Sequence, residues 1–349
     1  MKSNNFPLLG LLILLVACSP TGSQKQFAAA DSPLAVKVQA LTRNDYQAKY
    51  EPQKGVLHGA GQDIKSFKEY AKVLGPNRHP IFYMTYIGIT ASKEEVAKWG
   101  LRLKEELNSL PSDVMPQIGL NMTGGNDDGS GQTGGVAEGQ FDEQIAVFIA
   151  ALKDIDRKCY VRIGYEFEGS WNGYAPDAYV ASFIKITQAM RDAELSAATV
   201  WCSGGGSANF MPWPQLAAYY PGDEWVDWWG IDIFSPEEIT DPRLITFLQK
   251  ADSYQKPVMI GETTPRYVGT LGGTTSWNAW FKPFFQLVYE NPQIKAISYI
   301  NWDWAYWSDS LGFEWHDWQD ARLEQNDSIS QAYVHELSKE LFIHAKNSK

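Results

Sequence analysis

The chain has 349 residues, 44% of them hydrophobic and 20% charged, which is typical of a globular protein with one large core. Its formal net charge of −11 argues against a nucleic-acid partner, because that kind of binding needs a basic surface. The same sign disfavours strongly sulfated or carboxylated polymers, unless a local basic groove offsets it.

The amino terminus has the form of an export signal. A single Lys2 precedes an apolar run from Leu8 to Val16, which is too short to cross a membrane. The run ends in Leu-Val-Ala-Cys, which resembles the lipobox of bacterial lipoproteins, whose cysteine becomes the lipidated first residue. We therefore predict a signal peptide over residues 1–18 and lipidation at Cys18, with a plain secretory signal as the alternative.

Residues 19–50 are rich in Ser, Gln, Ala, Asp and Lys and have little periodicity, so we interpret them as a tether. A lipid anchor and a tether place the remaining domain, residues 51–349, at the bacterial cell envelope, on its periplasmic or its outer face. The other two cysteines, Cys159 and Cys202, fall at opposite ends of predicted strands, which favours two buried thiols over a disulfide.

From residue 54 onward, short apolar runs alternate with stretches of helical period. The predicted strands are 55–61, 79–89, 115–122, a run beginning at 159, 198–202, 226–234, 257–263 and 294–304. The predicted helices are 64–74, 92–110 with a Ser92/Glu95 capping box, 141–157, 175–195, 241–255, 276–290 and 328–343. Strands alternating with helices in this way predict the α/β class and a (β/α)₈ TIM barrel in a single domain.

In such a barrel the chemistry gathers at the carboxyl ends of the strands. The predicted ends carry Asn121, Glu166, Asp232, Glu262 and Trp302. The loop over residues 121–135 is rich in glycine and contains three consecutive Asn and Asp residues at 126–128. Calcium binding is one interpretation of this loop, but its spacing does not match an EF-hand, so we favour a flexible loop that lines the substrate.

Two of these strands end in a glutamate. Because side chains alternate along a strand, Arg162 and Glu166 are expected on one face, and Glu262 is expected on the same inward face as Val258 and Ile260. Two inward glutamates can bring their carboxyl groups to one cavity. In glycoside hydrolases, a separation of about 5 to 5.5 Å favours retention and about 6.5 to 9.5 Å favours inversion.

The pattern resembles clan A of the glycoside hydrolases, and most closely family 26, known mainly for β-mannanases and β-1,3-xylanases. Arg162 and Glu166 match that family's arginine four residues before its acid/base, and Gly169 with Trp171 match the Gly-x-Trp that follows. The likeness spans roughly residues 54–343.

Two later segments extend the resemblance. Residues 220–232 are similar to the family's approach to its sixth strand, and residues 256–263 are similar to the strand that carries its nucleophile, which implies this role for Glu262. Trp302 stands where the family places an aromatic floor under the sugar being cleaved.

The chain also departs from the mannanases of that family at three positions. Tyr165 stands where they usually have a histidine before the acid/base, and Asn121 stands where a histidine is common. Phe234 replaces a tyrosine whose hydroxyl contacts the nucleophile. The first two changes alter groups that line the cleavage site, so the substrate need not be mannan.

The resemblance implies retaining hydrolysis of internal β-linkages in a mannan-like or β-1,3-xylan-like polysaccharide. Glu262, held ionised by Arg162, attacks the anomeric carbon, while Glu166 protonates the departing oxygen and then deprotonates the attacking water. This chemistry requires neither a metal nor an organic cofactor. We expect a monomer whose partners are the polysaccharide and, through the lipid anchor, the membrane.

The remaining predicted contacts are with the sugar. Twelve of the 14 tryptophans lie between residues 201 and 318, and we expect Trp171, Trp201 and Trp302 to contact substrate because each lies near the carboxyl end of a strand. Arg162 and Tyr165 belong to the same predicted set. For Asp232 two interpretations stay open, a contact with a sugar hydroxyl and a structural acid that binds backbone amides.

Two rival functions remain at this point. One is a surface lipoprotein that binds glycan without cleaving it, and the presence of both glutamates and Arg162 argues against it, since binding alone does not require them. The other is a barrel hydrolase that acts on algal galactans, which is favoured by the missing histidine and disfavoured by the acidic charge.

Overall fold

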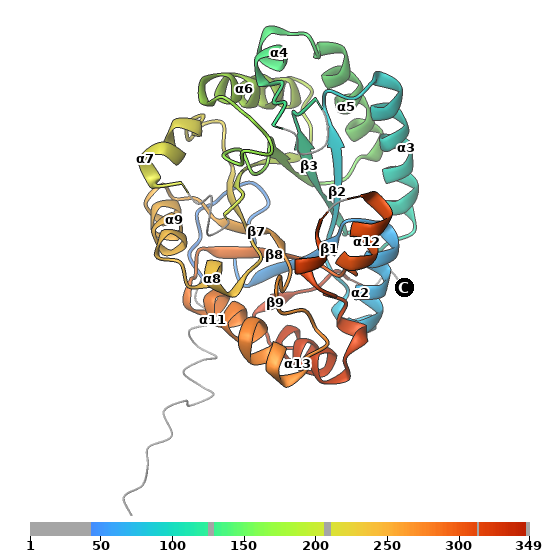
Figure 1. The fold of residues 1–349 in the computed structure, drawn as a ribbon. Helices are drawn as coiled ribbons and strands as arrows, with labels where there is room; N and C mark the ends of the chain where they lie inside the picture. Colours follow the sequence, from blue (N-terminus) through green and yellow to red (C-terminus); the bar gives the residue numbers. More distant parts are fainter. Residues whose placement is uncertain (1–42, 125–128, 206–210, 313, 347–349) are drawn as a thin grey trace, which may run out of the picture.

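Eight parallel strands close into a barrel in the computed structural model, which describes residues 43–124, 129–205, 211–312 and 314–346 (Figure 1). The strands are β1 (Val56–Gly61), β2 (Phe82–Gly88), β3 (Met115–Asn121), β4 (Cys159–Ile163), β5 (Ala197–Ser203), β6 (Trp228–Ile233), β7 (Val258–Thr263) and β8 (Ile294–Ile300). Each pairs in parallel with the next, and β1 pairs with both β8 and β2, which closes the ring. The predicted (β/α)₈ barrel is confirmed.

Helices surround the barrel, and most begin where the periodicity predicts. The longer ones are α2 (Ile64–Leu74), α3 (Lys93–Asn108), α5 (Asp142–Ile155), α6 (Pro176–Asp192), α9 (Pro242–Ser253), α11 (Lys282–Glu290), α12 (Trp304–Leu311) and α13 (Asp327–Leu337). The Ser92/Glu95 capping box at the start of α3 is present as predicted.

Two predictions near the carboxyl terminus were wrong in detail. The predicted eighth strand ends at Ile300, and Asp303 caps α12, because its side chain accepts a hydrogen bond from the Tyr306 amide. The predicted last helix, 328–343, breaks after α13 into a short strand, β9 (Phe342–Ile343), which pairs with the start of β1.

Side chains alternate between two apolar layers, one inside the barrel and one between the strands and the helices. Along β5, Val200 and Cys202 belong to the inner layer, whereas Trp201 belongs to the outer layer with the helix residues. A strand buried on both faces therefore places neighbouring residues in different compartments. Which layer a residue enters decides whether it can reach a site at the barrel's end.

The amino end of the barrel is covered by residues 43–51. Residues 43–50, which the sequence analysis placed in the tether, therefore belong to the folded domain. Arg43 donates to the carbonyl groups of Val288 and Asn291, both at 2.7 Å. Glu51 forms a buried ion pair with Lys295 at 3.1 Å. These hydrogen bonds and this ion pair join the segment to the barrel, a role that its polar composition did not indicate.

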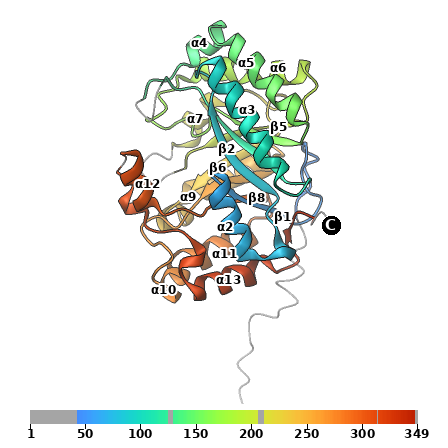
Figure 2. The same ribbon diagram turned by 90° about the vertical axis from the view of Figure 1, so that its right-hand side faces the viewer.

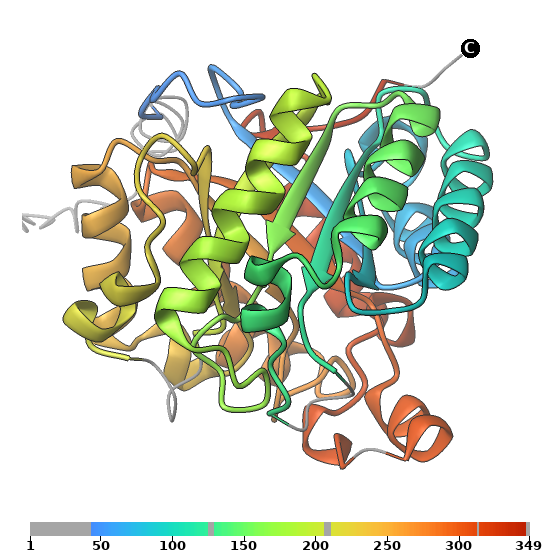
Figure 3. The same cartoon turned by 90° about the horizontal axis from the view of Figure 1, so that it is seen from above.

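The two ends of the barrel are covered by different segments of the chain. Figure 3 shows the strand arrowheads pointing toward the side where α12 projects, while residues 43–55, in blue, lie at the opposite side. Figure 2 shows the same division from another direction, with α12 on one side and the blue segment of residues 43–51 on the other. In the described residues Cys159 and Cys202 are free, buried thiols, as predicted.

None of the helices in these described ranges combines the length and apolar character that a membrane crossing requires. Cys18 and residues 126–128 of the glycine-rich loop, an Asn and two Asp, lie outside the described ranges. Beyond its gap this loop continues into a short helix, α4 (Thr133–Glu138).

Candidate active site

A cavity of about 630 Å³ opens at the carboxyl end of the barrel, and we call it the main cavity. It is lined by side chains from the ends of several strands and from the segment after β8. Its lining residues are Gln62, Tyr86, Tyr165, Glu166, Trp171, Asn172, Gly204, Phe234, Ser235, Glu238, Glu262, Arg266, Tyr267, Trp304, Glu314, Trp315 and Trp318. Both predicted catalytic glutamates therefore face the same cavity.

A distorted turn after β4 aims Glu166 into the main cavity. The strand ends at Ile163, and the backbone then enters the left-handed region at Gly164 (φ 56°) and again at Glu166 (φ 52°). Left-handed backbone is costly for a residue with a side chain and persists only where the surroundings hold it. Asn172 does so by donating from Nδ2 to the carbonyl groups of Tyr165 (3.0 Å) and Glu166 (2.9 Å).

Glu262 reaches the main cavity because β7 contains an irregularity. Val258 and Ile260 lie in the outer layer, so strict alternation would also turn Glu262 outward, and the predicted shared face was wrong. The pairing of β6 with β7 shifts from Ile231–Ile260 to Asp232–Glu262, which leaves Gly261 as an extra residue. Such a bulge re-aims the side chain that follows it.

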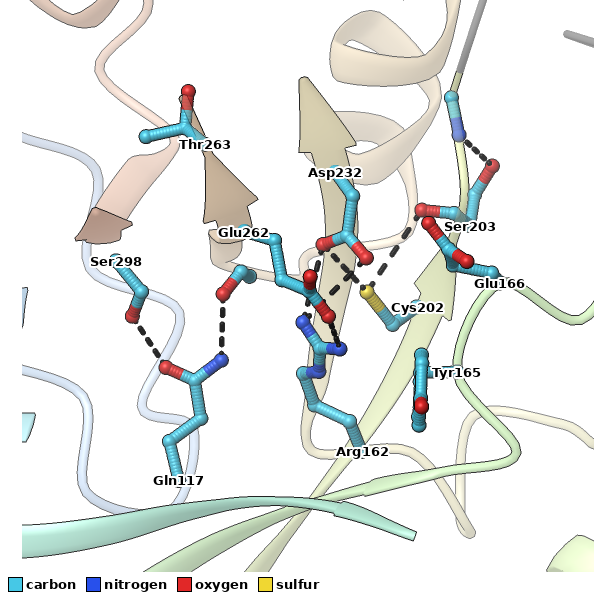
Figure 4. Close-up of polar contacts among 12 residues, drawn as sticks. Gln117, Arg162, Tyr165, Glu166, Cys202, Ser203, Asp232, Glu262, Thr263 and Ser298 are labelled. Carbon is cyan, nitrogen blue, oxygen red and sulfur yellow. Dashed lines mark hydrogen bonds and ion pairs between the residues drawn. The ribbon is translucent and has the colours of Figure 1, made fainter. Parts of the chain in front are cut away.

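Gly261 is held from inside the barrel and tolerates no larger residue. Gln117 donates from Nε2 to the Gly261 carbonyl at 2.7 Å, and the Ser298 hydroxyl bonds to the same glutamine (Figure 4). A Cβ at position 261 would lie 2.6 Å from Arg162 Nη1 and 2.7 Å from Asp232 Oδ1. The bulge therefore requires glycine at position 261, because glycine has no Cβ.

Arg162 lies beneath the main cavity and bridges two carboxylates. Its Nη2 donates to Glu262 and its Nη1 donates to Asp232 Oδ1 at 3.2 Å (Figure 4). Arg162 and Asp232 are fully buried and do not line the cavity, so their predicted contact with substrate was wrong. Arg162 acts instead by holding Glu262, as predicted for the nucleophile, and Asp232 is the structural acid of the two interpretations.

The two glutamates lie in different electrostatic surroundings. Glu262 is 7% exposed and paired with the Arg162 guanidinium. Burial raises the pKa of Glu166 well above its ordinary value, and the negative charges of Asp232 and Glu262 raise it further. Trp171 Nε1 opposes this by donating to Glu166 Oε2 at 2.8 Å. Glu166 is thus favoured in the protonated form while Glu262 is paired with a cation, which is a division of surroundings that suits acid/base chemistry on two carboxyl groups.

Aromatic side chains form the walls around this pair. Tyr165 and Trp171 line the main cavity, where the sequence placed them. The Tyr165 ring also lies 4.7 Å from the Arg162 guanidinium, and Tyr86 packs edge-on against it with ring centroids 5.5 Å apart. These contacts fix the wall next to both reacting groups.

Two tryptophans predicted to contact the sugar do not line the main cavity. Trp201 is fully buried in the outer layer, where it stacks on Phe167 at 4.6 Å. Trp302 is 8% exposed and lines a separate pocket, while Trp304, two residues later, lines the main cavity. Nearness to a strand's end does not distinguish the inner from the outer layer, and the turn that starts α12 decides which tryptophan faces the glutamates.

The sequence interpretation missed the wall contributed by the loops after β7 and β8. Arg266 lies between the rings of Tyr267 and Trp318, at 4.7 and 4.5 Å, and its guanidinium is paired with Asp317 at 2.6 Å. Trp315 joins the same wall. The concentration of tryptophans in residues 302–318 was the available signal for this wall. In the described ranges no group of three or more His, Cys, Asp and Glu side chains is arranged to hold a metal ion.

Two carboxyl groups that face one cavity of a (β/α)₈ barrel are an arrangement that glycoside hydrolases use, and comparison with known proteins supports this class. The family model "Glycosyl hydrolase family 26" matches residues 127–271, which include both glutamates. The chain is a glycoside hydrolase, and residues 127–271 are similar to family 26.

Its relatives are similar to it over most of their length. A β-1,3-xylanase from a Vibrio species is 28% identical, with 91% of this chain and 72% of that protein covered. A β-1,3-xylanase from an Alcaligenes species is also 28% identical, with 87% and 68% covered. A modular endo-β-1,4-mannanase from Cellulomonas fimi has the same fold, with a TM-score of 0.62 at 15% identity, over 90% of this chain and 76% of that one.

Proposed function

We propose that this protein cleaves internal β-linkages of a neutral polysaccharide, of the β-1,3-xylan type first and the mannan type second, with retention of the anomeric configuration. The observation that carries the proposal is that Glu166 and Glu262 face one cavity while only Glu262 is held by Arg162. The order of the two substrates follows the two β-1,3-xylanases that the chain resembles.

The reaction proceeds by two displacements. Glu262, ionised beside Arg162, attacks the anomeric carbon as the protonated Glu166 donates its proton to the leaving oxygen. The covalent sugar ester is then released by water, from which Glu166, now ionised, takes a proton. Asp232 contributes by holding the other side of the Arg162 guanidinium.

The charges around the main cavity favour a neutral polymer. Four acidic residues line it, the protonated Glu166 and the three glutamates Glu238, Glu262 and Glu314. Arg266 is the cation among the described lining residues, and its charge is already paired with Asp317. A sulfated or carboxylated chain would meet net repulsion here, which disfavours the galactan alternative in its sulfated forms.

The test is to incubate residues 43–349 with β-1,3-xylan, β-mannan, β-glucans and galactans, and to measure reducing ends, product size and product anomer. We expect a rapid fall in polymer length on one neutral substrate and products that keep the β-configuration. Glu262→Ala should be inactive and remain folded by circular dichroism. An active Glu262→Ala variant, inverted products, or binding without any released ends would overturn the proposal.

We also propose that the chain is lipid-anchored through Cys18 to the bacterial cell envelope. The Leu-Val-Ala-Cys ending of its apolar leader supports this proposal. In a bacterial host, radiolabelled fatty acid should be incorporated into the full chain and lost in Cys18→Ser, and the variant should move from the membrane fraction to the soluble fraction. Equal membrane retention of both proteins would contradict the anchor.

A further inference from the structure

Glu168, two residues beyond the proposed acid Glu166, is a buried carboxyl group to which the two displacements give no task. It is 7% exposed, and it does not belong to the described residues that line the main cavity. It therefore has no contact with a substrate in that cavity. Burying a carboxyl group costs free energy unless hydrogen bonds compensate for the lost water, so its hydrogen-bond partners indicate its role.

Glu168 is bonded to the segment where β5 ends, residues 203–205, which we call the β5 exit. The fully buried Ser203 donates from Oγ to Glu168 Oε1, and the Gly205 amide donates to the same Ser203 hydroxyl at 3.3 Å. The amides of Gly204 and Gly205 also face the carboxyl group and favour its ionised form. One carboxyl group thus ties together all three residues of the β5 exit.

The β5 exit is also the surface on which Glu166 rests. The Glu166 amide donates to the Cys202 carbonyl at 2.8 Å, directly before this segment. A Cβ built on Gly204 would lie 3.1 Å from Glu166 Cβ and 3.3 Å from Trp171 Cζ2. The Gly204 backbone therefore packs against both the acid and the indole that donates a hydrogen bond to it. A shift of the β5 exit would move Glu166 relative to the leaving oxygen.

We propose that Glu168 is a positioning residue for Glu166, and that it acts by holding the β5 exit in place. The link runs from the Glu168 carboxylate through Ser203 to the Gly204 backbone, and from there to the side chains of Glu166 and Trp171. This inference rests on the proposed function, because it assigns Glu168 to the same proton transfer.

The hold on the β5 exit depends on the charge of Glu168. Burial raises the pKa of Glu168 to about 7, and the hydrogen bonds from Ser203 and the two glycine amides oppose this rise. Tyr179 of α6 and Tyr219, before β6, also face the carboxyl group, and both stay neutral because burial raises their pKa.

The sign of the resulting pH dependence follows from these contacts. Above pH 7 the ionised carboxylate accepts charge-assisted hydrogen bonds, which are about twice as strong as neutral ones. Below pH 7 the neutral group holds the β5 exit less firmly. Activity should therefore rise with pH through about 7, which is opposite in sign to the loss that deprotonation of Glu166 causes.

The test measures kcat/KM against pH on the polymer that the wild-type protein cleaves. We expect a fall of about threefold to tenfold as the pH drops through the pKa of Glu168. Glu168→Gln should have the lower value at every pH and should lack this step. Ser203→Ala keeps the carboxyl group but removes a hydrogen bond that favours its ionised form, so the step should move to higher pH. This shift carries the test if Glu168→Gln does not fold.

A second substrate separates positioning of Glu166 from general support of the fold. On an aryl glycoside whose leaving group departs without a proton, kcat/KM does not depend on Glu166 as an acid, so the step should be absent. A step of equal size on both substrates would overturn the inference. Glu238→Gln is the matched control, because Glu238 is 6% exposed and lies in the loop after β6. It should retain the step on the polymer.

Nuclear magnetic resonance reads the hold on the β5 exit without any substrate. The amide signals of Gly204 and Gly205 should shift with a midpoint near pH 7 in the wild-type protein, and this shift should be absent in Glu168→Gln. An active wild-type protein without the step, or glycine signals that do not titrate, would overturn the inference alone. A wild-type protein that releases no reducing ends fails the proposed function, and the glycine signals then decide separately whether Glu168 holds the β5 exit.

Discussion

The two ends of the barrel each bury a cation against carboxylates, and they differ in charge balance and in access. At the amino end Lys295 meets Glu51, one charge against one, under the cover of residues 43–51. At the carboxyl end Arg162 is paired with both Asp232 and Glu262, and a third carboxyl group, that of Glu166, lies nearby beside an open cavity. Burial, and after it the surplus of acid, raises the pKa of Glu166, which suits the open end to acid/base chemistry, whereas the closed end is balanced and serves stability.

The sharpest way to break this comparison is to remove the surplus acid. Glu166→Gln should lower kcat on polymer by about 10²–10⁴-fold, because the leaving oxygen then receives no proton. The loss should shrink on aryl glycosides whose leaving group departs without protonation, and initial rates on both substrates measure this. Equal losses on the two substrates would contradict the acid role of Glu166.

Removing the cation at the closed end should affect folding instead of chemistry. Lys295→Met leaves Glu51 buried without its partner, so we expect the free energy of unfolding in urea to fall by about 3–5 kcal/mol. The double variant Lys295→Met, Glu51→Gln should recover most of this loss. The activity of the folded fraction should not change in either variant, and a selective loss of kcat would show that the two ends are not independent.

The bulge of β7 can be tested with a single methyl group. Gly261→Ala forces a Cβ to within 2.6 Å of Arg162 Nη1, so Glu262 and Arg162 must shift, and we expect kcat/KM to fall by about 10²-fold. Gly134→Ala in α4 is the matched control, because a Cβ there meets nothing within 4 Å. Wild-type activity in Gly261→Ala would mean that the bulge does not position the nucleophile.

The smallest expected effect is a shift in the pH profile. Glu166 must be protonated to act, so activity persists above its ordinary pKa and is lost as pH rises through the raised value. Trp171 stabilises the ionised form, so Trp171→Phe should raise the pKa of Glu166 and move the alkaline limb of kcat/KM upward by about one pH unit. Trp318→Phe, which changes the same cavity without that hydrogen bond, should leave the limb in place.

The sequence predicts the barrel and the two glutamates that face its cavity because both depend on local patterns. Apolar runs of strand length define β1 to β8, and a glutamate at the end of β4 or β7 must lie at the carboxyl edge of the barrel. The direction in which each side chain points was harder to predict from the sequence. The prediction for β7 assumed strict alternation and so took no account of the extra residue, Gly261. The register of β7 with β6 reveals this bulge.

The predicted binding residues show that a local sequence pattern does not reveal which layer a side chain enters or which distant strands it contacts. Trp201 and Cys202 are neighbours, yet one packs against helices and the other lies inside the barrel, and their sequence does not say which. Arg162 satisfies two carboxylates at the same time, which depends on strands far apart in the chain. The role of residues 43–50 follows from hydrogen bonds to segments more than a hundred residues away, such as those of Arg43.

The segment over residues 43–51 has a practical consequence for handling this enzyme. Because it is bound at the amino end of the barrel, whatever is attached ahead of Arg43 pulls on the side that faces away from the glutamates. A protein immobilised on a bead or a sensor chip through the residues before Arg43 therefore exposes the opening of its main cavity to the bulk solution. A long insoluble fibre can reach the cavity there.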